Sequence, residues 1–103
     1  MNKLYRKGYY YERKVLHFLI NRNYLVWRSP GSKSPIDVIA IDDKGNVRLI
    51  QVKSHKNIKK EELKVLKELA KKYENVPNVE IEIWIFLENN LKKYNKKDIL
   101  TML

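Results

Sequence analysis

Three polar side chains near the middle of the chain have the types and spacing of a site in which two of them bind a divalent cation and the third, a lysine, acts beside it. Asp37 offers a carboxylate, and fourteen residues later Gln51 and Lys53 stand two apart, so they share one face if this segment is a strand. Mg²⁺ prefers oxygen ligands, which Asp37, the Gln51 amide and the main-chain carbonyl of Val52 can supply. Such a cation acidifies a bound water and offsets charge on a phosphorane-like transition state, so the set suits phosphodiester hydrolysis.

Two further roles complete this chemistry. Glu12 can hold a metal-bound water, and Lys53 can orient the attacking water or stabilise the scissile phosphate. The expected cofactor is Mg²⁺, with Mn²⁺ as its substitute. Ordinary explanations stand beside these roles: Asp37 can cap a strand next to a turn, and Glu12 can be a solvated helix residue paired with Arg13 or Lys14.

The hydrophobic pattern supplies elements that can bring these residues together. Apolar residues at helical spacing predict helices over 4–23, 59–74 and 96–103. Branched and aromatic residues predict strands over 24–28, 36–41, 47–53 and 79–87. Asp42–Asn46 is a hairpin connection in which Gly45 is available for positive φ. Pairing across that hairpin places the Asp37 end of one strand beside the Gln51–Lys53 end of the next.

The order of these elements predicts a single α/β domain over residues 1–103. The first three strands form an antiparallel meander, whereas 47–53 and 79–87 flank a helix and are expected to form a right-handed parallel crossover. The fold class is therefore a mixed central β-sheet with an α-β-β-β-α-β core, flanked by a helix on each face. The first helix, which carries Glu12, is expected to pack over this sheet.

The segment 79–87 alternates between two faces. Its isoleucines lie on one side, while Trp84 and Phe86 lie on the other. The final helix or a homodimer contact is expected to cover these two rings. A solvated surface is predicted for Lys92, Lys93, Lys96 and Lys97.

The positive charge is concentrated in the first part of the chain. Residues 1–60 hold 14 Lys and Arg against 4 Asp and Glu, which accounts for the whole net charge of +10. This asymmetry indicates a polyanionic partner, most simply nucleic acid, although plain solubility is the alternative. Phosphate contacts are predicted for three lysines that follow the strand at 47–53, namely Lys56, Lys59 and Lys60.

Several classes of protein are excluded by composition. The chain has no cysteine and two histidines, which excludes disulfides, thiolate zinc sites and a multi-histidine metal cage. No apolar run approaches the roughly 18 residues of a membrane span, and the N-terminus lacks the apolar stretch of a signal peptide. We expect a cytoplasmic protein with no membrane partner.

Four short motifs, in order, resemble those of a known family. They are Arg6-Lys7-Gly8 with Glu12-Arg13, Arg28-Ser29-Pro30-Gly31-Ser32, Asp37-Val38-Ile39-Ala40 and Val52-Lys53-Ser54. Pro35-Ile36-Asp37 followed by Gln51-Val52-Lys53 is similar to the signature of the PD-(D/E)XK nuclease superfamily. Over roughly residues 5–75 the set resembles the archaeal Holliday junction resolvases.

The resemblance implies a restriction-endonuclease-like fold and a Mg²⁺-dependent endonuclease that cleaves branched DNA, working as a homodimer. It implies that Lys53 is the catalytic lysine and that Ser32 is catalytic or contacts DNA. Metal-site roles are implied for Glu12, Asp37, Gln51 and Val52. DNA contacts are predicted for Arg6, Lys7, Arg13, Arg28 and Lys33.

Gln51 is where the chain departs from the resolvases, which carry Glu at this position. A neutral ligand removes one negative charge and is expected to weaken Mg²⁺ binding. Gln-x-Lys versions nevertheless resemble those of some active modification-dependent restriction nucleases. Gln51 therefore leaves a catalytically weakened DNA-binding module as an open alternative. A duplex nuclease of restriction or repair type and an RNA substrate are also open, because no motif here reads the shape of the substrate.

Overall fold

The computed structural model describes residues 3–29 and 34–102, and the side chains of 9–29 and 34–102. Within these residues it forms three helices and five strands: α1 (Lys3–Ile20), β1 (Leu25–Arg28), β2 (Val38–Ile41), β3 (Val47–Lys53), α2 (Lys60–Lys72), β4 (Val79–Leu87), β5 (Asn90–Tyr94) and α3 (Lys96–Thr101). The sheet has the order β1-β2-β3-β4-β5, with β3 and β4 parallel and the other neighbours antiparallel. This mixed sheet with flanking helices confirms the predicted fold class. None of the described helices is long and apolar enough to cross a membrane.

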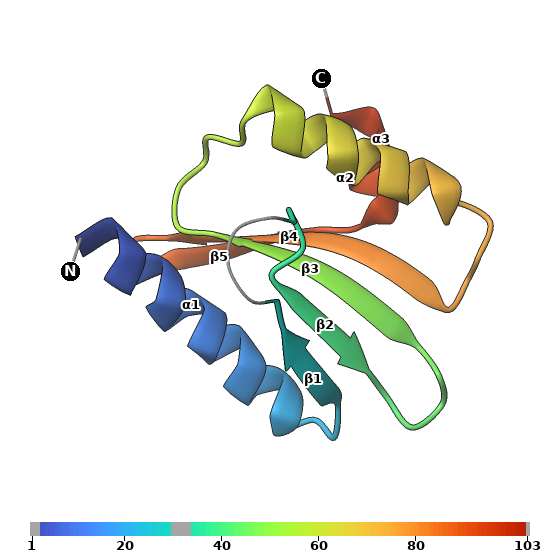
Figure 1. Cartoon of the computed structure of the whole chain (residues 1–103), viewed down its shortest axis with the longest axis horizontal. Coiled ribbons are helices and arrows are strands. Elements are labelled where there is room, and N and C mark those ends of the chain that lie inside the picture. The colour runs from blue at the N-terminus through green and yellow to red at the C-terminus, as the bar shows by residue number, and fades with distance from the viewer. Residues whose placement is uncertain (1–2, 30–33, 103) are drawn as a thin grey trace.

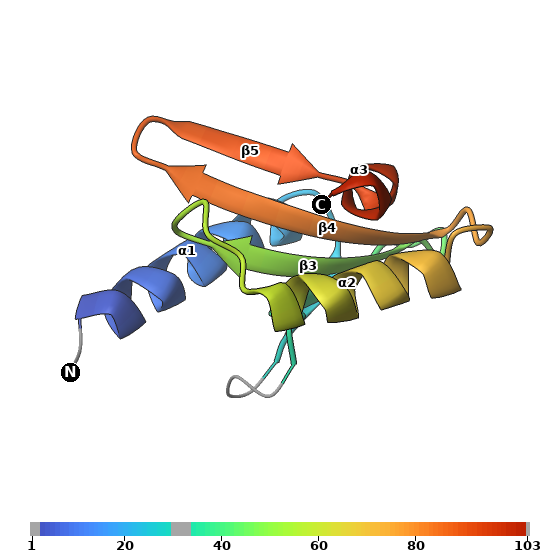
Figure 2. The same cartoon turned by 90° about the horizontal axis from the view of Figure 1, so that it is seen from above.

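The helices divide between the two faces of the sheet (Figures 1 and 2). Val15 and Leu19 of α1 pack in one core with alternate residues of β2 and β3. Leu66 of α2 and Ile99 of α3 pack in the other core, with the isoleucines of β4. Since successive strand residues point to opposite faces, Ile50 and Val52 contact the α1 side, and Gln51 and Lys53 face the α2 side.

The hairpin between β2 and β3 sets the register of the site. The Asp42 carboxylate accepts hydrogen bonds from the backbone N–H of Lys44 at 2.9 Å and of Asn46 at 2.8 Å, and Gly45 has a φ of +86°. A hydrogen bond from the Asn46 side-chain amide, followed by these backbone bonds, lowers the pKa of Asp42. The Asp37 backbone N–H continues the ladder by donating to the carbonyl of Ile50 at 2.9 Å. The predicted approach of the two strand ends is therefore found.

β5 is an element that the sequence pattern does not predict. It pairs antiparallel with β4, and Lys92 and Lys93 lie opposite Ile85 and Trp84. Charged residues are typical of an edge strand, where they discourage pairing with another chain. Because these charges interrupt the alternation of apolar residues, the sequence pattern does not predict the strand.

The expectation that the final helix covers Trp84 and Phe86 is wrong, because α1 covers them. The ring of Phe18 meets Trp84 edge to face at 5.6 Å, and Tyr11 stacks on Phe86 at 4.6 Å between centroids. The final helix, α3, packs instead on the opposite face, since Ile99 joins the isoleucine core. The Lys93 ammonium lies 4.2 Å from the Trp84 ring, and partial burial lowers the pKa of Lys93.

The prediction that Lys96 is a solvated lysine is also wrong. Its side chain is buried, and its Nζ donates to the carbonyls of Tyr73 at 2.7 Å, Val76 at 3.0 Å and Val79 at 2.8 Å. Its backbone N–H donates to the Glu80 carboxylate. Lys96 therefore fastens the start of α3 to the connection between α2 and β4.

A bidentate ion pair crosses β3 and β4 on the α1 side. Arg48 Nε and Nη2 donate to the two carboxylate oxygens of Glu82 at 2.6 and 2.7 Å, and Trp84 Nε1 donates to Glu82 at 2.8 Å. These bonds to Glu82 raise the pKa of Arg48. Arg48 therefore stabilises the pairing of β3 with β4, although it is one of the 14 basic residues among residues 1–60.

Candidate active site at the edge between β2 and β3

Asp37 lies one residue before β2 and is held against β3 by its own carboxylate. Its Oδ2 accepts a hydrogen bond from the backbone N–H of Val52 at 2.8 Å. Its main-chain carbonyl accepts from the N–H of Ser29 at 2.9 Å. The Val52 N–H therefore fixes the carboxylate of Asp37 and the Ser29 N–H fixes its backbone, as a residue that must keep a defined geometry requires.

The electrostatic surroundings of Asp37 show which charged groups converge on it. Burial raises the pKa of this carboxyl to about 6, although the hydrogen bond from the Val52 N–H acts in the opposite direction. The carboxylate of Glu12 raises the pKa further, the ammonium of Lys53 lowers it, and the carboxylate of Glu62 raises it. A carboxyl with a pKa so close to neutral is typical of a functional site, and a bound cation would favour its charged form.

Gln51 is buried at the same edge with only 6% of its surface exposed. Its Nε2 lies 3.4 Å from the Val52 carbonyl, and its Oε1 is buried without a hydrogen-bond partner. An unsatisfied buried oxygen costs about 1–3 kcal/mol unless something binds it. With Asp37 and the Val52 carbonyl, it forms the kind of oxygen set that fits Mg²⁺ or Mn²⁺.

Negative charge is scarce in this oxygen set. Among the side chains of 9–29 and 34–102, no three His, Cys, Asp or Glu groups lie close enough together to hold a metal ion. A cation at this edge would therefore depend on the single carboxylate of Asp37 and on neutral oxygens.

Lys53 forms a close ion pair that the sequence did not predict. Its Nζ lies 2.6 Å from Oε2 of Glu62, in the first turn of α2, and the two side chains are 13% and 29% exposed. The contact is an ion pair outside hydrogen-bonding angles, since Glu62 Oε2 has no hydrogen-bond partner. The signal for it is periodicity: position 62 continues the buried stripe of Leu66 and Ala70 by one helical turn, yet it holds a carboxylate.

Glu12 reaches the site from α1, on the other side of the sheet. Its carboxylate lies 3.6 Å from Arg28 of β1, so the alternative pairing with Arg13 or Lys14 is wrong. The guanidinium of Arg28 also lies 4.5 Å from the Tyr9 ring, while Arg13 is exposed and lies 5.8 Å from that ring. Glu12 and Arg28 are thus placed together, near Asp37.

The remaining predicted residues divide into two groups. Exposed side chains are found for Lys56, Lys59 and Lys60, which follow β3 and lead into α2. Ser32 and Lys33 lie outside the described residues, as do the side chains of Arg6 and Lys7, although the backbone of these last two belongs to α1.

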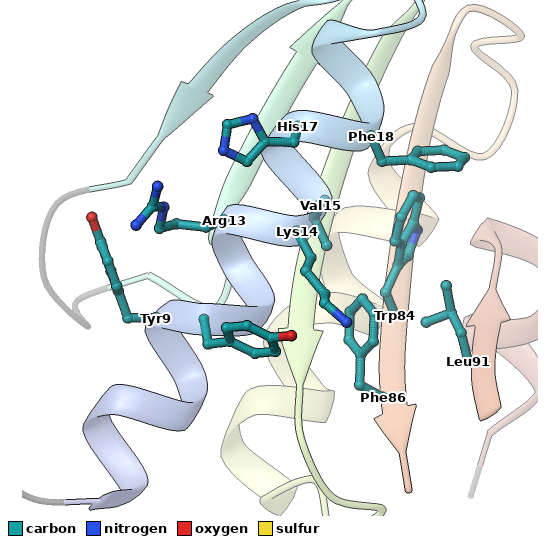
Figure 3. A pocket seen from close by; sticks show the side chains of 10 residues that line it. Tyr9, Arg13, Lys14, Val15, His17, Phe18, Trp84, Phe86 and Leu91 are labelled. Carbon is teal, nitrogen blue, oxygen red and sulfur yellow. The ribbon is translucent and has the colours of Figure 1, made fainter. Parts of the chain in front are cut away.

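A groove of about 680 Å³ lies elsewhere, between α1 and the β4–β5 pair (Figure 3). Its walls are largely apolar and include Phe18, Trp84, Phe86 and Leu91, with Arg13 among the polar residues around it. None of the residues that converge on Asp37 lines it. We therefore place the candidate active site at the β2–β3 edge and not in this groove.

Comparison with known proteins identifies a family and solved structures with a similar fold. A family model described as archaeal Holliday junction resolvase (Hjc) matches residues 3–98. Among solved structures, Hjc from Archaeoglobus fulgidus, a Holliday junction resolvase from an archaeal hyperthermophile, superposes with a TM-score of 0.66 at 21% identity over 88% of this chain and 74% of that chain. The superposition shows a shared fold. No curated protein matches the chain.

Proposed function

This chain belongs to the archaeal Holliday junction resolvase family, and from that membership we propose that it is a nuclease that hydrolyses phosphodiester bonds in branched DNA. The observation that carries the proposal is the family match, which spans residues 3–98. The convergence of Asp37, Gln51 and Lys53 at one sheet edge supports it.

We propose that the reaction depends on Mg²⁺, with Mn²⁺ as a substitute, held by Asp37, the Gln51 amide oxygen and the Val52 carbonyl. When bound, the cation supplies Lewis acidity to a water and to the phosphate oxygens. Lys53 orients the attacking water or stabilises charge on the scissile phosphate. Glu12 holds a water on the α1 side, where Arg28 keeps its carboxylate in place.

The proposed DNA surface surrounds this edge. Exposed Lys56, Lys59 and Lys60 supply positive charge beside β3 and Arg13 supplies it from α1, whereas the charge of Arg28 on β1 is partly offset by Glu12. A four-way junction must be cut at two symmetric positions, so we propose a homodimer that presents two such edges.

The test uses a labelled four-way junction and a linear duplex of the same sequence, each incubated with Mg²⁺, with Mn²⁺ and with EDTA. We expect metal-dependent cleavage of the junction over the duplex. Asp37→Ala and Lys53→Ala are each expected to reduce cleavage by about 100-fold or more. Asp43→Ala is the matched control, because Asp43 is an exposed carboxylate in the hairpin. Full cleavage by Asp37→Ala, or no metal-dependent cleavage by the wild type, would contradict the proposal.

One observation favours a second candidate, a DNA-binding module that has lost catalysis. Gln51 leaves Asp37 as the single carboxylate of the proposed ligand set, and the described side chains contain no cluster of three metal-binding acids or histidines. This candidate predicts salt-sensitive binding of the junction without cleavage in either metal. Binding and cleavage measured on the same junction therefore separate the two.

A further inference from the structure

The proposed metal site lacks negative charge, and the formal charges around it show by how much. Asp37 and Glu12 are the acids assigned to it, and Lys53 and Arg28 are the basic groups that lie against them. Two negative and two positive charges cancel, so this set has no net attraction for a divalent cation. Gln51, which adds an oxygen, adds no charge.

Glu62 adds a third carboxylate to this site, and the proposed function assigns no role to it. It approaches from α2, on the side of the sheet that Gln51 and Lys53 face, and its Oε2 lies 2.6 Å from Lys53 Nζ. Its charge acts on Asp37, whose pKa it raises together with Glu12. With Glu62 included, the formal charge of the site becomes −1.

The burial of Glu62 distinguishes it from an ordinary helix-surface acid. Glu61, its neighbour in the same first turn of α2, is exposed, whereas the Glu62 Oε2 atom is buried and makes no hydrogen bond. A buried carboxylate oxygen is costly unless a charged partner offsets the loss of water. The Oε1 atom of Gln51 is also buried, and 94% of that residue is covered. The buried Glu62 Oε2 thus has Lys53 as its charged partner, whereas the buried Gln51 Oε1 has no hydrogen-bond partner.

We propose that Glu62 is a positioning residue of this site and that it supplies, from α2, the negative charge that Gln51 does not supply from β3. Its carboxylate holds the ammonium of Lys53 toward Asp37 and restores a net negative charge for a divalent cation. The inference rests on the proposed function, since it assigns a role toward the same metal.

The test measures Mn²⁺ affinity of the full chain by isothermal titration calorimetry, without DNA. We expect Glu62→Gln to weaken Mn²⁺ binding by about tenfold or more, because one formal charge is removed while the shape is kept. Adding Gln51→Glu to that variant returns the charge to the site and is expected to restore the affinity to within about threefold of the wild type. The matched control is Glu61→Gln, which is expected to leave the affinity unchanged.

The double variant separates a charge role from a structural one, since a fold damaged by Glu62→Gln would not be repaired by a substitution on β3. Thermal unfolding of each variant checks that the fold is kept. Wild-type affinity in Glu62→Gln, or no recovery in the double variant, overturns the inference while leaving the proposed function intact. A wild-type chain that binds no Mn²⁺ and cuts no junction overturns the metal-dependent function, and the inference with it.

Discussion

Asp37 holds its negative charge at a cost to the folded state. Burial raises its pKa from 3.8 to about 6, so the native state binds this proton more tightly than the unfolded chain does. The neutral form carries no such cost. The stability that Asp37 contributes through its protonated form is therefore fully present below about pH 4 and is lost as the pH rises through 6.

The first prediction tests that sign. Asp37→Asn removes the charge but keeps an oxygen that can accept from the Val52 N–H. We expect it to raise the free energy of unfolding by about 1–2 kcal/mol at pH 8, a figure reduced for the partial exposure of the group, and by about zero at pH 4. Urea unfolding of both proteins at the two pH values, without metal, is the measurement. A uniform change at both would contradict it. Asp43→Asn, at an exposed site, controls for the loss of a charge from the surface.

The same pKa predicts how metal binding varies with pH. A cation needs the ionised carboxylate, so Mn²⁺ affinity is expected to be nearly constant above pH 7 and to fall about tenfold for each pH unit below 6. Titrations of the full chain between pH 5 and 8 check this. A pH-independent affinity would show that Asp37 is not among the ligands.

At the same scale, the site shows what a sequence can and cannot predict. Asp37, Gln51 and Lys53 were identified because a short hairpin links them, so local pattern fixes their relative positions. The sequence pattern does not identify Glu62, because its role depends on how α2 packs against the sheet, which is a tertiary property. The ion pair of Glu12 with Arg28 in place of its neighbours on the helix has the same origin.

Among the elements, α3 depends on a single buried ammonium. Lys96 Nζ donates to the carbonyls of Tyr73 and Val76 in the α2–β4 connection and of Val79 at the start of β4. Lys96→Met is expected to lower the free energy of unfolding by about 2–4 kcal/mol, because it removes three hydrogen bonds from a buried charged donor, although the Tyr73 and Val76 carbonyls still accept from backbone N–H groups. Lys97→Met, at the exposed next residue, is expected to change it by less than about 0.5 kcal/mol. Chemical denaturation of the Lys96→Met and Lys97→Met variants measures both changes. Equal losses of unfolding free energy would contradict the structural role of Lys96.

The elements also differ in how far they could be predicted. β4 matches its predicted bounds because an apolar residue stands at every second position over its length, and β3 matches because it is rich in branched residues and begins directly after the hairpin turn. β5 could not be found, since an edge strand is defined by its neighbour β4 and not by its own composition. The face chosen by α3 depends equally on tertiary packing, because Ile99 could have completed either core.

For the whole molecule, internal ion pairs reduce the positive charge that is free to meet DNA. Arg48, Lys53 and Arg28 each lie against a carboxylate. The free charge lies on exposed residues such as Lys56 and Lys59. The basic excess of the first sixty residues is therefore partly structural.

A salt titration measures that free charge. Lys56→Ala and Lys59→Ala are each expected to make the dependence of log Kd for a four-way junction on log salt shallower by about 1. Lys71→Ala is the control, because Lys71 pairs with Glu74 at the far end of α2, 2.9 Å away. Fluorescence anisotropy at several salt concentrations provides the slopes. Equal slopes in all variants would remove these lysines from the DNA surface.

An apolar patch on the β1–β2 pair gives the proposed homodimer a place to form. Leu25 and Trp27 are 74% and 67% exposed, and Ile41, which pairs with Leu25, lies on the same face. We expect Trp27→Glu to convert a dimer into a monomer in light-scattering measurements of molar mass. Ile20→Glu, at an exposed apolar residue at the end of α1, is expected to leave the dimer unchanged. A Trp27→Glu protein that stays dimeric would place the interface elsewhere.

The tight turn at Asp42–Asn46 has a consequence for the order in which the molecule forms. Closing so short a loop loses little chain entropy, so the β2–β3 hairpin can form before the rest of the sheet has assembled. Asp37, Gln51 and Lys53 would then meet early in folding, in a fragment that contains neither α1 nor α2. Glu12 and Glu62 can reach them only when the helices dock. The complete set of charges is thus assembled only when the helices dock, so the affinity for a cation arises in the last step of folding.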